Sequence, residues 1–232
     1  VADTAKQRRA VEFLNAQWLL FYPQNLKQKY LPQYIFVVDR LLDYNSSGTT
    51  VDSTKYFKTN WFNNITVTGF GDRMDTMSVA TKARLRNELN FSFLYHLIYI
   101  KNKNFFPQEF YDVSALKYGV SPRDSTSTVY NDYLKVGLLP PTGVTYPGVT
   151  YPGSTTNFST TTYQSQDQDV AQYLRMITLQ NDAFVNNIIN NTNAAKVKQK
   201  YLILIQFFTS MGIDIRSLNS YNPSILGPLD IY

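Results

Sequence analysis

One long polar stretch, residues 120–168, limits how this chain of 232 residues can fold. Ser, Thr, Pro and Gly dominate it, and one pentapeptide occurs twice in succession, at 144–148 and 149–153. Each Pro-Gly pair is a good centre for a type II turn, because Pro presets the first dihedral and Gly accepts the positive second one. A loop this long inside a compact domain is usually functional or disordered. We therefore expect an insertion here, with the core built from the segments on either side.

Two helices are predicted near the start of the chain. Residues 5–22 carry apolar residues at helical spacing, and Pro23 ends this pattern. Pro32 suits the first turn of a second helix, which we expect to run as far as Leu42. The polar run at 45–48 then stops that helix.

Alternation replaces helical spacing over residues 54–70, where aromatic and β-branched residues predict one strand or a hairpin arm. A long helix is expected next, from Asp75 or Thr76 to about Lys103, although its apolar second half also fits a buried strand. A shorter helix is expected over 108–118, directly after a proline.

Two further helices are predicted after the insertion. Ser165 or Asp167 can cap the first of them. The second is expected over 194–211, is apolar nearly all round, and ends at Gly212. Residues 213–232 mix apolar residues with Pro and Gly, which indicates an extended tail with apolar surface to bury.

These patterns predict a mainly α fold: a helical bundle with a small β strand or hairpin element, a long polar loop insertion and an extended C-terminal tail. The expected divisions are a helical bundle at 1–119 with its strand or hairpin arm near 54–70, the loop insertion at 120–168, a closing helix pair of the same domain at 169–212, and the tail at 213–232.

The composition excludes several classes of site. The chain has no cysteine, which excludes disulfides, thiolate zinc sites, cysteine nucleophiles and thiolate-held iron–sulfur clusters. His96 is the single histidine, so a Ser-His-Asp triad would have to use it, and its aromatic and aliphatic neighbours favour a core or interface histidine. No run approaches the roughly 18 apolar residues that span a bilayer, and no signal-peptide core opens the sequence, so we expect a soluble protein.

No catalytic, cofactor or metal site is predicted. The acid pairs Asp72/Asp75 and Asp167/Asp169 stand beside expected helix starts, where carboxylates complement the helix dipole. Gly69-Phe70-Gly71 is only a fragment of a nucleotide-loop pattern and fits a turn after a strand. We therefore expect no cofactor and no enzymatic activity.

The basic residues allow two interpretations. Lys82, Arg84 and Arg86 lie on the long helix, and the chain carries a net charge of +5. Such a charge permits contact with phosphates without requiring it. A solvated helix face and a DNA-facing surface therefore both remain open for these three side chains.

The aromatic content points to interfaces. Aromatic residues make up 15% of the chain, 18 of them tyrosines, and many fall in expected loops or in the tail. Tyrosine gives a large, rigid contact area with a polar tip and is enriched at interfaces. Apolar tails that cannot fold alone usually bind a neighbour. A general richness in Asn and Tyr is the alternative explanation.

The succession of helical bundle (5–44 with 76–118), polar insertion (120–168), closing helices (165–211) and tail (213–232) resembles the head–tail connector proteins of tailed bacteriophages. The Asn-, Tyr- and Thr-rich, cysteine-free composition resembles virion proteins of crAss-like podoviruses, which infect gut Bacteroidetes.

This resemblance implies a ring, commonly of twelve copies, that docks on the portal protein at the head–tail junction and passes DNA through its lumen. Further partners would be other tail or ring proteins, with assembly in the host cytoplasm and no membrane contact. The tail would insert into the portal or a neighbouring subunit through Ile225, Leu226, Leu229, Ile231 and Tyr232, and the Tyr-Pro-Gly loop would meet the next ring.

The alternative function is a glycan-binding module. Trp18, Trp61 and exposed tyrosines would then serve as stacking platforms for sugar rings. Such a binder is expected to act as a monomer with aromatics clustered around a cleft, whereas a connector makes head-to-tail contacts.

Overall fold

The computed structural model describes residues 4–39, 43–44, 51–52, 57–60, 64–70, 73–120, 129–139, 145–146, 149–150 and 163–219. The fold is mainly helical with small β elements, as the sequence predicts. The chain forms two compact units: unit 1 comprises Val1–Lys101 and Ser217–Tyr232, and unit 2 comprises Asn102–Arg216. This boundary differs from the predicted one after residue 119, because the segment around 108–118 packs with the later helices.

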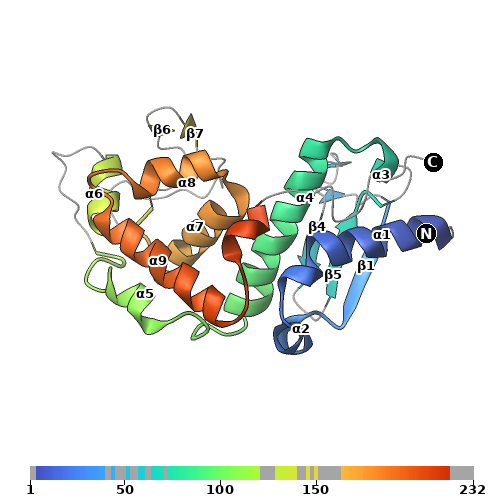
Figure 1. Ribbon diagram of the computed structural model, residues 1–232, viewed down its shortest axis with the longest axis horizontal. Coiled ribbons are helices and arrows are strands. Elements are labelled where there is room, and N and C mark those ends of the chain that lie inside the picture. The colour runs from blue at the N-terminus through green and yellow to red at the C-terminus, as the bar shows by residue number, and fades with distance from the viewer. Residues whose placement is uncertain are drawn as a thin grey trace. The chain divides into compact units, whose positions relative to one another are not determined.

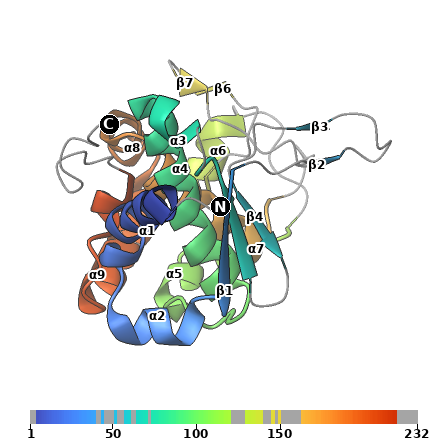
Figure 2. The same ribbon diagram turned by 90° about the vertical axis from the view of Figure 1, so that its right-hand side faces the viewer.

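Unit 1 combines a small sheet with helices, and Figures 1 and 2 show α1 (Thr4–Gln17) and α4 (Val79–Ser92) on one side of that sheet. The sheet order is β1 (Tyr34–Val38), β5 (Asn64–Thr68), β4 (Phe57–Asn60), with β1 parallel and β4 antiparallel to β5. The other described elements of this unit are η1 (Leu19–Phe21), α2 (Gln24–Tyr30), β2 (Asp43–Tyr44), β3 (Val51–Asp52), α3 (Arg73–Thr76) and the π-helix η2 (Phe93–Tyr99).

The core of unit 1 lies between the sheet and the helices. Ile65 and Val67, on the central strand, are completely buried. Phe93 contacts the rings of Trp18 and Tyr22 at centroid distances of 5.8 and 4.5 Å. These aromatic contacts fix the turn after α1 against the end of α4.

The helix predicted from Pro32 to Leu42 is wrong, because residues 34–38 form the strand β1. Ile35 and Val37 are β-branched and pair in register with Ile65 and Val67 of β5, so pairing outweighs the helix signal of the proline. The predicted strand or hairpin near 54–70 is confirmed as the antiparallel pair β4–β5.

The long helix after residue 75 is confirmed, and its apolar second half is helical rather than a strand. α4 begins after Ser78, whose hydroxyl accepts a hydrogen bond from the Thr81 amide at 3.1 Å. The cap is therefore Ser78 and not Asp75 or Thr76. The helix continues into η2, where hydrogen bonds of the i to i+5 type shift the register of the side chains.

Unit 2 is a helical unit (Figure 1), and its core is aromatic. Phe106, Phe110, Tyr173 and Phe208 are buried together, with centroid distances of 5.1 Å for Phe110–Tyr173 and 5.9 Å for Phe106–Phe208. Its described elements are α5 (Gln108–Asp112), α6 (Val129–Lys135), β6 (Thr145–Tyr146), β7 (Val149–Thr150), α7 (Gln166–Leu179), α8 (Asp182–Ile189) and α9 (Ala195–Ser210); η3 (Ile215–Asn219) crosses the boundary to unit 1.

Local signals set most helix ends in unit 2. Ser165 caps α7 in a reciprocal capping box with Gln168. Asn181 caps a separate helix, α8, so three helices, α7, α8 and α9, stand where the sequence predicts two. Gly212 ends α9 as predicted, at a φ of 79° that favours glycine.

The predicted loop insertion contains ordered structure. α6 lies inside the interval 120–168, and Leu138 and Leu139 just after it are completely buried. Gly137 makes the turn between α6 and these two leucines, at a φ of 80°. A Cβ at this position would lie only 3.0 Å from the Ser114 hydroxyl oxygen, which is too close for a larger residue. β6 and β7 pair with each other in antiparallel fashion, and the first Pro-Gly, where a turn is predicted, lies outside the described residues. The start of the predicted extended tail is the short helix η3 instead, and residues 220–232 lie outside the described residues.

Candidate functional site

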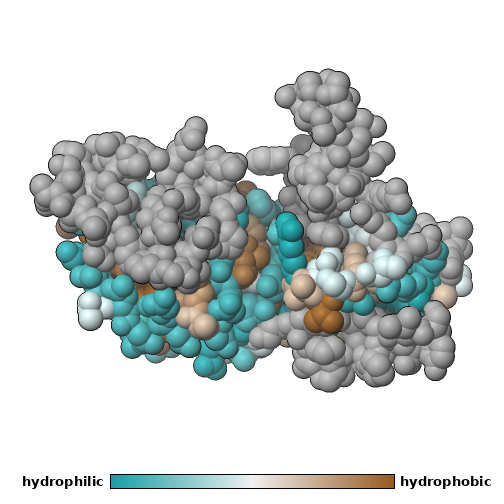
Figure 3. Space-filling model, turned by 90° about the horizontal axis from the view of Figure 1, so that it is seen from above, coloured by the Kyte–Doolittle hydropathy of each residue, from teal (hydrophilic) through white to brown (hydrophobic). Residues whose placement is uncertain are grey.

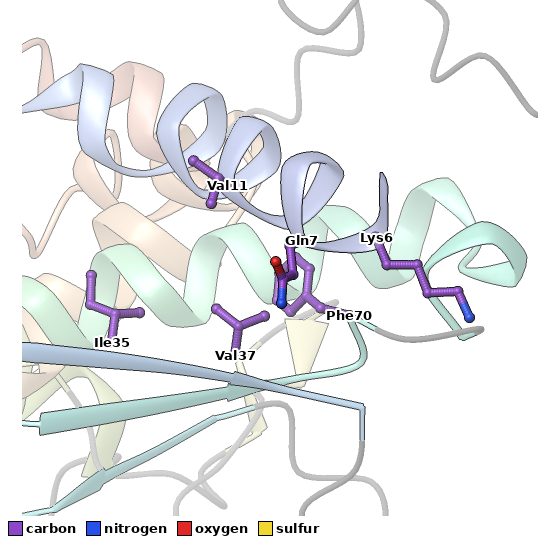
Figure 4. A pocket seen from close by; sticks show the side chains of 6 residues that line it. All are labelled: Lys6, Gln7, Val11, Ile35, Val37 and Phe70. Carbon is purple, nitrogen blue, oxygen red and sulfur yellow. The ribbon is translucent and has the colours of Figure 1, made fainter. Parts of the chain in front are cut away.

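A cavity of about 290 Å³ lies in unit 1 between α1 and the edge strand β1 (Figure 4). Phe13 of α1 packs edge-on against Phe70 at a centroid distance of 5.6 Å and holds the helix to the end of the sheet. We call this cavity the α1–β1 groove. It is lined by Lys6, Gln7, Val11, Ile35, Val37 and Phe70.

The alternation of β1 produces one wall of the groove. Ile35 and Val37 point toward α1 and are half-buried (Figure 4). Val11 faces the groove from the helix and remains 62% exposed. An exposed valine above two half-buried aliphatic side chains gives the groove an apolar rim and floor.

The groove suits binding rather than acid–base chemistry. Its polar lining groups are the Lys6 ammonium and the Gln7 amide, and none of its lining residues is an acid, an alcohol or a histidine. Its volume is at the lower end of the about 300–1,000 Å³ that ligand pockets have. A short run of apolar side chains would fit it better than a large cofactor. The described residues contain no group of three or more metal-ligating side chains.

The opposite face of β1 carries an exposed aromatic pair. Tyr34 and Phe36 stack at a centroid distance of 6.1 Å and an interplanar angle of 20°. They are 56% and 49% exposed. β1 is also an edge strand among the strands that the structure describes, since β5 is its one partner there. Edge strands with exposed apolar side chains are sites where other chains pair.

Arg86 is buried in unit 1, with an exposure of 1%. Its Nη2 donates a hydrogen bond to the Ser217 carbonyl, and its guanidinium lies 4.6 Å from the centre of the Phe21 ring. Among the described residues, its Nε and Nη1 have no hydrogen-bond partner. Burial lowers the pKa of Arg86 to about 10, although the Coulomb interaction with Tyr22 acts in the opposite direction.

Asn90, one turn further along α4, also binds the backbone that follows Arg216. Its amide nitrogen donates to the Gln17 carbonyl at 3.3 Å and to the Leu218 carbonyl at 3.5 Å, and its amide oxygen accepts from the Tyr22 hydroxyl at 2.8 Å. Burial raises the pKa of Tyr22, so this phenol stays a donor. Arg86 and Asn90 together fix the backbone at 217–218 to α4.

Unit 2 contains a buried ion pair that the sequence does not predict. Lys200 of α9 and Asp169 of α7 are both 0% exposed at their side chains, with Nζ and Oδ2 2.6 Å apart. The Tyr118 hydroxyl donates to the same Asp169 oxygen at 2.6 Å and accepts from Lys200 at 3.0 Å. Gln164 donates to the other Asp169 oxygen at 3.4 Å.

Burial controls the electrostatics of this cluster. It raises the pKa of Asp169 and lowers the pKa of Lys200, each against the attraction of the other charge. Burial and the neighbouring Asp169 both raise the pKa of Tyr118. Phe110 and Tyr173 lie beside the Lys200 ammonium, with ring centres 4.6 and 5.4 Å away. Because the pair is enclosed, its role is to hold α7 and α9 together.

The structure separates the three basic residues that were candidates for DNA contact. Arg84 is exposed and lies 3.7 Å from Glu88. Lys82 is 8% exposed, and burial lowers its pKa while Asp75 acts in the opposite direction. The prediction of a DNA-facing side chain is wrong for Arg86 and for Lys82, because both are buried within the unit. Burial of a guanidinium by Phe21 cannot be deduced from spacing along a helix.

His96 is exposed, so it is not the core histidine that was one of its two predicted roles, and its role at an interface stays a prediction. Its ring contacts Tyr95 and Phe91 at centroid distances of 5.0 and 6.0 Å. Trp18 is completely buried, so it cannot serve as a sugar platform. Trp61 lies outside the described residues, as do all five tail candidates, Ile225, Leu226, Leu229, Ile231 and Tyr232.

Among the helices that the structure describes, none combines the length and the hydropathy needed to cross a bilayer. Comparison of the chain with protein-family models, with curated protein sequences and with solved structures gave no match.

Proposed function

We propose that the protein is a non-enzymatic structural protein of a bacteriophage virion, which forms a ring between portal and tail and lets DNA pass. The order of its segments, which resembles that of head–tail connectors, supports this proposal. The observation that carries it is the exposure of large apolar side chains on each of the two units.

A head-to-tail ring requires every copy to present two different surfaces, one to each neighbour. In unit 1 the exposed apolar group is Val11, Tyr34 and Phe36, around the α1–β1 groove and the outer face of the strand. In unit 2 Leu116 is 86% exposed and Leu202 of α9 is also exposed. Scattered exposed apolar residues are ordinary, but a stacked aromatic pair on an edge strand beside an apolar groove is an interaction surface.

A lumen that DNA slides through is expected to be polar and weakly basic. On the one face that Figure 3 shows, the coloured residues are mostly hydrophilic, with apolar residues in small groups. A net charge of +5 supplies weak, sequence-independent attraction to phosphates. Arg84 is the one of the three predicted basic residues whose side chain is exposed. The mechanism is mechanical: symmetric assembly, a sealed joint and a lumen that holds DNA loosely.

The native mass tests this proposal. Native mass spectrometry and negative-stain images are recorded over a range of concentrations, with and without the portal ring of the same virus. The expected result is closed rings, or conversion of monomers into rings on the portal. A chain that stays monomeric and does not bind the portal overturns the proposal.

Variants at the exposed apolar residues sharpen this test. Phe36→Ser on unit 1 and Leu116→Ser on unit 2 are each expected to weaken ring formation, since both side chains are exposed and the fold keeps its core. Gln206→Ser, at an exposed polar position on α9, is the matched control. Equal assembly of all three variants would contradict the assignment of these surfaces.

Glycan binding is the alternative, and the Tyr34–Phe36 pair is the observation that favours it. Aromatic faces exposed on a rigid strand can stack on sugar rings. A monomer that binds an oligosaccharide array, and loses this binding in Tyr34→Ala, would support the alternative over the ring.

A further inference from the structure

Lys200 and Asp169 bring an amine and a carboxyl group into contact inside unit 2. Nζ lies 2.6 Å from Oδ2, and both side chains are 0% exposed. Since a carbon–oxygen bond of this kind is about 1.2 Å long, Nζ lies at most about 4 Å from Cγ, the carbon that an amine attacks. A small rotation of the carboxyl group brings the two atoms to the about 3–3.5 Å from which such groups react. The contact between α7 and α9 is therefore also the geometry that precedes an amide bond.

The surroundings favour the uncharged, reactive forms of both groups. The ring centres of Phe110, Tyr118 and Tyr173 lie 4.6, 5.3 and 5.4 Å from the Lys200 Nζ. Burial lowers the pKa of Lys200 and raises the pKa of Asp169, which favours transfer of a proton from the ammonium to the carboxylate. The products are a neutral amine, which is a nucleophile, and a carboxylic acid. Exclusion of water from the site also protects an amide bond from hydrolysis.

The Tyr118 hydroxyl is placed to move the protons of this reaction. It donates to the Asp169 Oδ2 at 2.6 Å and accepts from the Lys200 Nζ at 3.0 Å. A hydroxyl in contact with both atoms can take a proton from the attacking nitrogen and pass its own proton to the leaving oxygen. Burial and Asp169 raise the pKa of Tyr118, so the phenol is protonated before and after this relay. Gln164 donates to Oδ1 at 3.4 Å, the oxygen that stays as the amide carbonyl.

We propose that the folded chain joins Lys200 to Asp169 by an intramolecular amide bond. The Nζ–Cγ bond forms and the Cγ–Oδ2 bond breaks. Oδ2 leaves as water, with the proton of the carboxylic acid and the proton that Tyr118 relays from the amine. The ion pair is the state from which the bond forms, and the step needs no oxidant, reductant or cofactor. The bond closes a loop of 31 positions and makes the contact of α7 with α9 permanent, whether or not the protein forms a ring.

Mass spectrometry of the full chain tests the proposal. The intact mass is followed from purification until it stops changing, with circular dichroism to show that the chain is folded. The expected mass is lower than that of the sequence by one water molecule. Digestion with trypsin after denaturation should give residues 136–175 joined to residues 199–216, because trypsin does not cleave after a modified Lys200. Absence of this joined peptide from the folded chain overturns the inference.

Two lysine variants separate the amide bond from other losses of water. Lys200→Arg keeps the positive charge but removes the amine, so it should keep the full mass and give no joined peptide. Lys198→Arg, at an exposed position on the same helix, is the matched control and should form the bond as the unmodified sequence does. Loss of water that persists in the Lys200 variant would come from cyclisation of an aspartate on its own backbone, and it would overturn the inference.

Tyr118→Phe tests the proton relay. It keeps the ring beside Lys200 and removes only the hydroxyl, so bond formation should slow by at least about tenfold. Tyr95→Phe, at a half-buried tyrosine of unit 1, should leave the rate of bond formation unchanged. Equal rates in the two variants would overturn the assignment of the relay to Tyr118. The joined peptide and the native mass are separate measurements, so the amide bond and the ring each stand or fall alone.

Discussion

Arg86 in unit 1 and Lys200 in unit 2 are two buried cations in opposite surroundings. Lys200 has a carboxylate 2.6 Å away and a phenol that bridges the two charges. Arg86 has a backbone carbonyl and the face of a phenylalanine, and no described carboxylate contributes to its pKa. A lysine ammonium is strongly hydrated and compact, whereas a guanidinium is delocalised and stacks on rings. The difference shows that the buried lysine ammonium is matched by a carboxylate, whereas the buried guanidinium is accommodated by a carbonyl and an aromatic ring.

The two sites also do different work. The Lys200 cluster joins α7 to α9, two helices of the interior of unit 2. Arg86 joins α4 to the segment that begins at Ser217. This segment belongs to unit 1 but follows the whole of unit 2 in the sequence. One site stabilises a helix pair, and the other fixes the return of the chain.

The largest expected effect comes from removing the counter-charge of Lys200. Asp169→Ala leaves a buried ammonium without its carboxylate, and we expect a loss of about 3–5 kcal/mol in the free energy of unfolding of unit 2. Urea denaturation followed by circular dichroism measures it. The double variant Asp169→Leu with Lys200→Met should lose much less, because no charge is then buried. A loss below about 1 kcal/mol in the single variant contradicts the structural role.

Removal of the bridging phenol should have an intermediate effect. Tyr118→Phe deletes the hydroxyl that donates to Asp169 and accepts from Lys200, and we expect a loss of about 1.5–3 kcal/mol because the bond is to a charged group. The same denaturation measurement applies. Tyr95→Phe, a half-buried tyrosine of unit 1, is the comparison that keeps the ring. Equal losses of unfolding free energy in the two variants would show that the hydroxyl between Asp169 and Lys200 contributes no more than that of Tyr95.

Arg86→Met should cost less than either, about 1–2 kcal/mol, since it removes one hydrogen bond but also a buried cation that has no counter-charge. Its main effect should be local: faster hydrogen exchange of the amides at 217–219. Arg84→Met, on the same helix with an exposed side chain, is the control. Unchanged hydrogen exchange of the amides at 217–219 in the Arg86 variant would contradict the role of Arg86 in holding this segment to α4.

The smallest effect is expected at Lys82. Burial lowers its pKa below the ordinary lysine value, so the folded state binds this proton less tightly than the unfolded state does. Its charged form is therefore a cost that is present below the folded pKa and disappears as the pH rises through it. Lys82→Met should stabilise unit 1 by a few tenths of a kcal/mol, roughly, at pH 7. The stabilisation by Lys82→Met should become smaller as the pH rises toward 10. A stabilisation that increases with pH would contradict a lowered pKa of Lys82 in the folded state.

Local signals predicted much of the fold. The Ser165 capping box, the end of α9 at Gly212 and the β4–β5 hairpin each depend on residues close together in the sequence. β1 was predicted as a helix because Pro32 and the apolar run after it fit both structures. Its pairing with β5, thirty residues later, decides the outcome, and single-sequence periodicity carries no information on that partner.

The candidate site shows the same limit. Asp169 was interpreted as one of the acids of a helix start, which its position in the first turn of α7 supports. Its pairing with Lys200 spans 31 positions and two helices, so neither residue has a local signal of a buried ion pair. Lys82 and Arg86 were grouped by charge alone. The burial of Arg86 follows from the packing of Phe21 and of Ser217, which the sequence does not locate.

The division of unit 1 into two stretches of sequence has a consequence for synthesis on the ribosome. Domains generally fold as units while the chain emerges from its N-terminus. Unit 2, residues 102–216, is one continuous stretch, so all its parts are present before unit 1 is whole. Arg86 and Asn90 emerge early but meet the Ser217 and Leu218 carbonyls only when those residues leave the exit tunnel. The first unit to begin emerging is therefore the last that can be completed. A nascent chain with residues up to 216 outside the exit tunnel has all of unit 2 beside an incomplete unit 1.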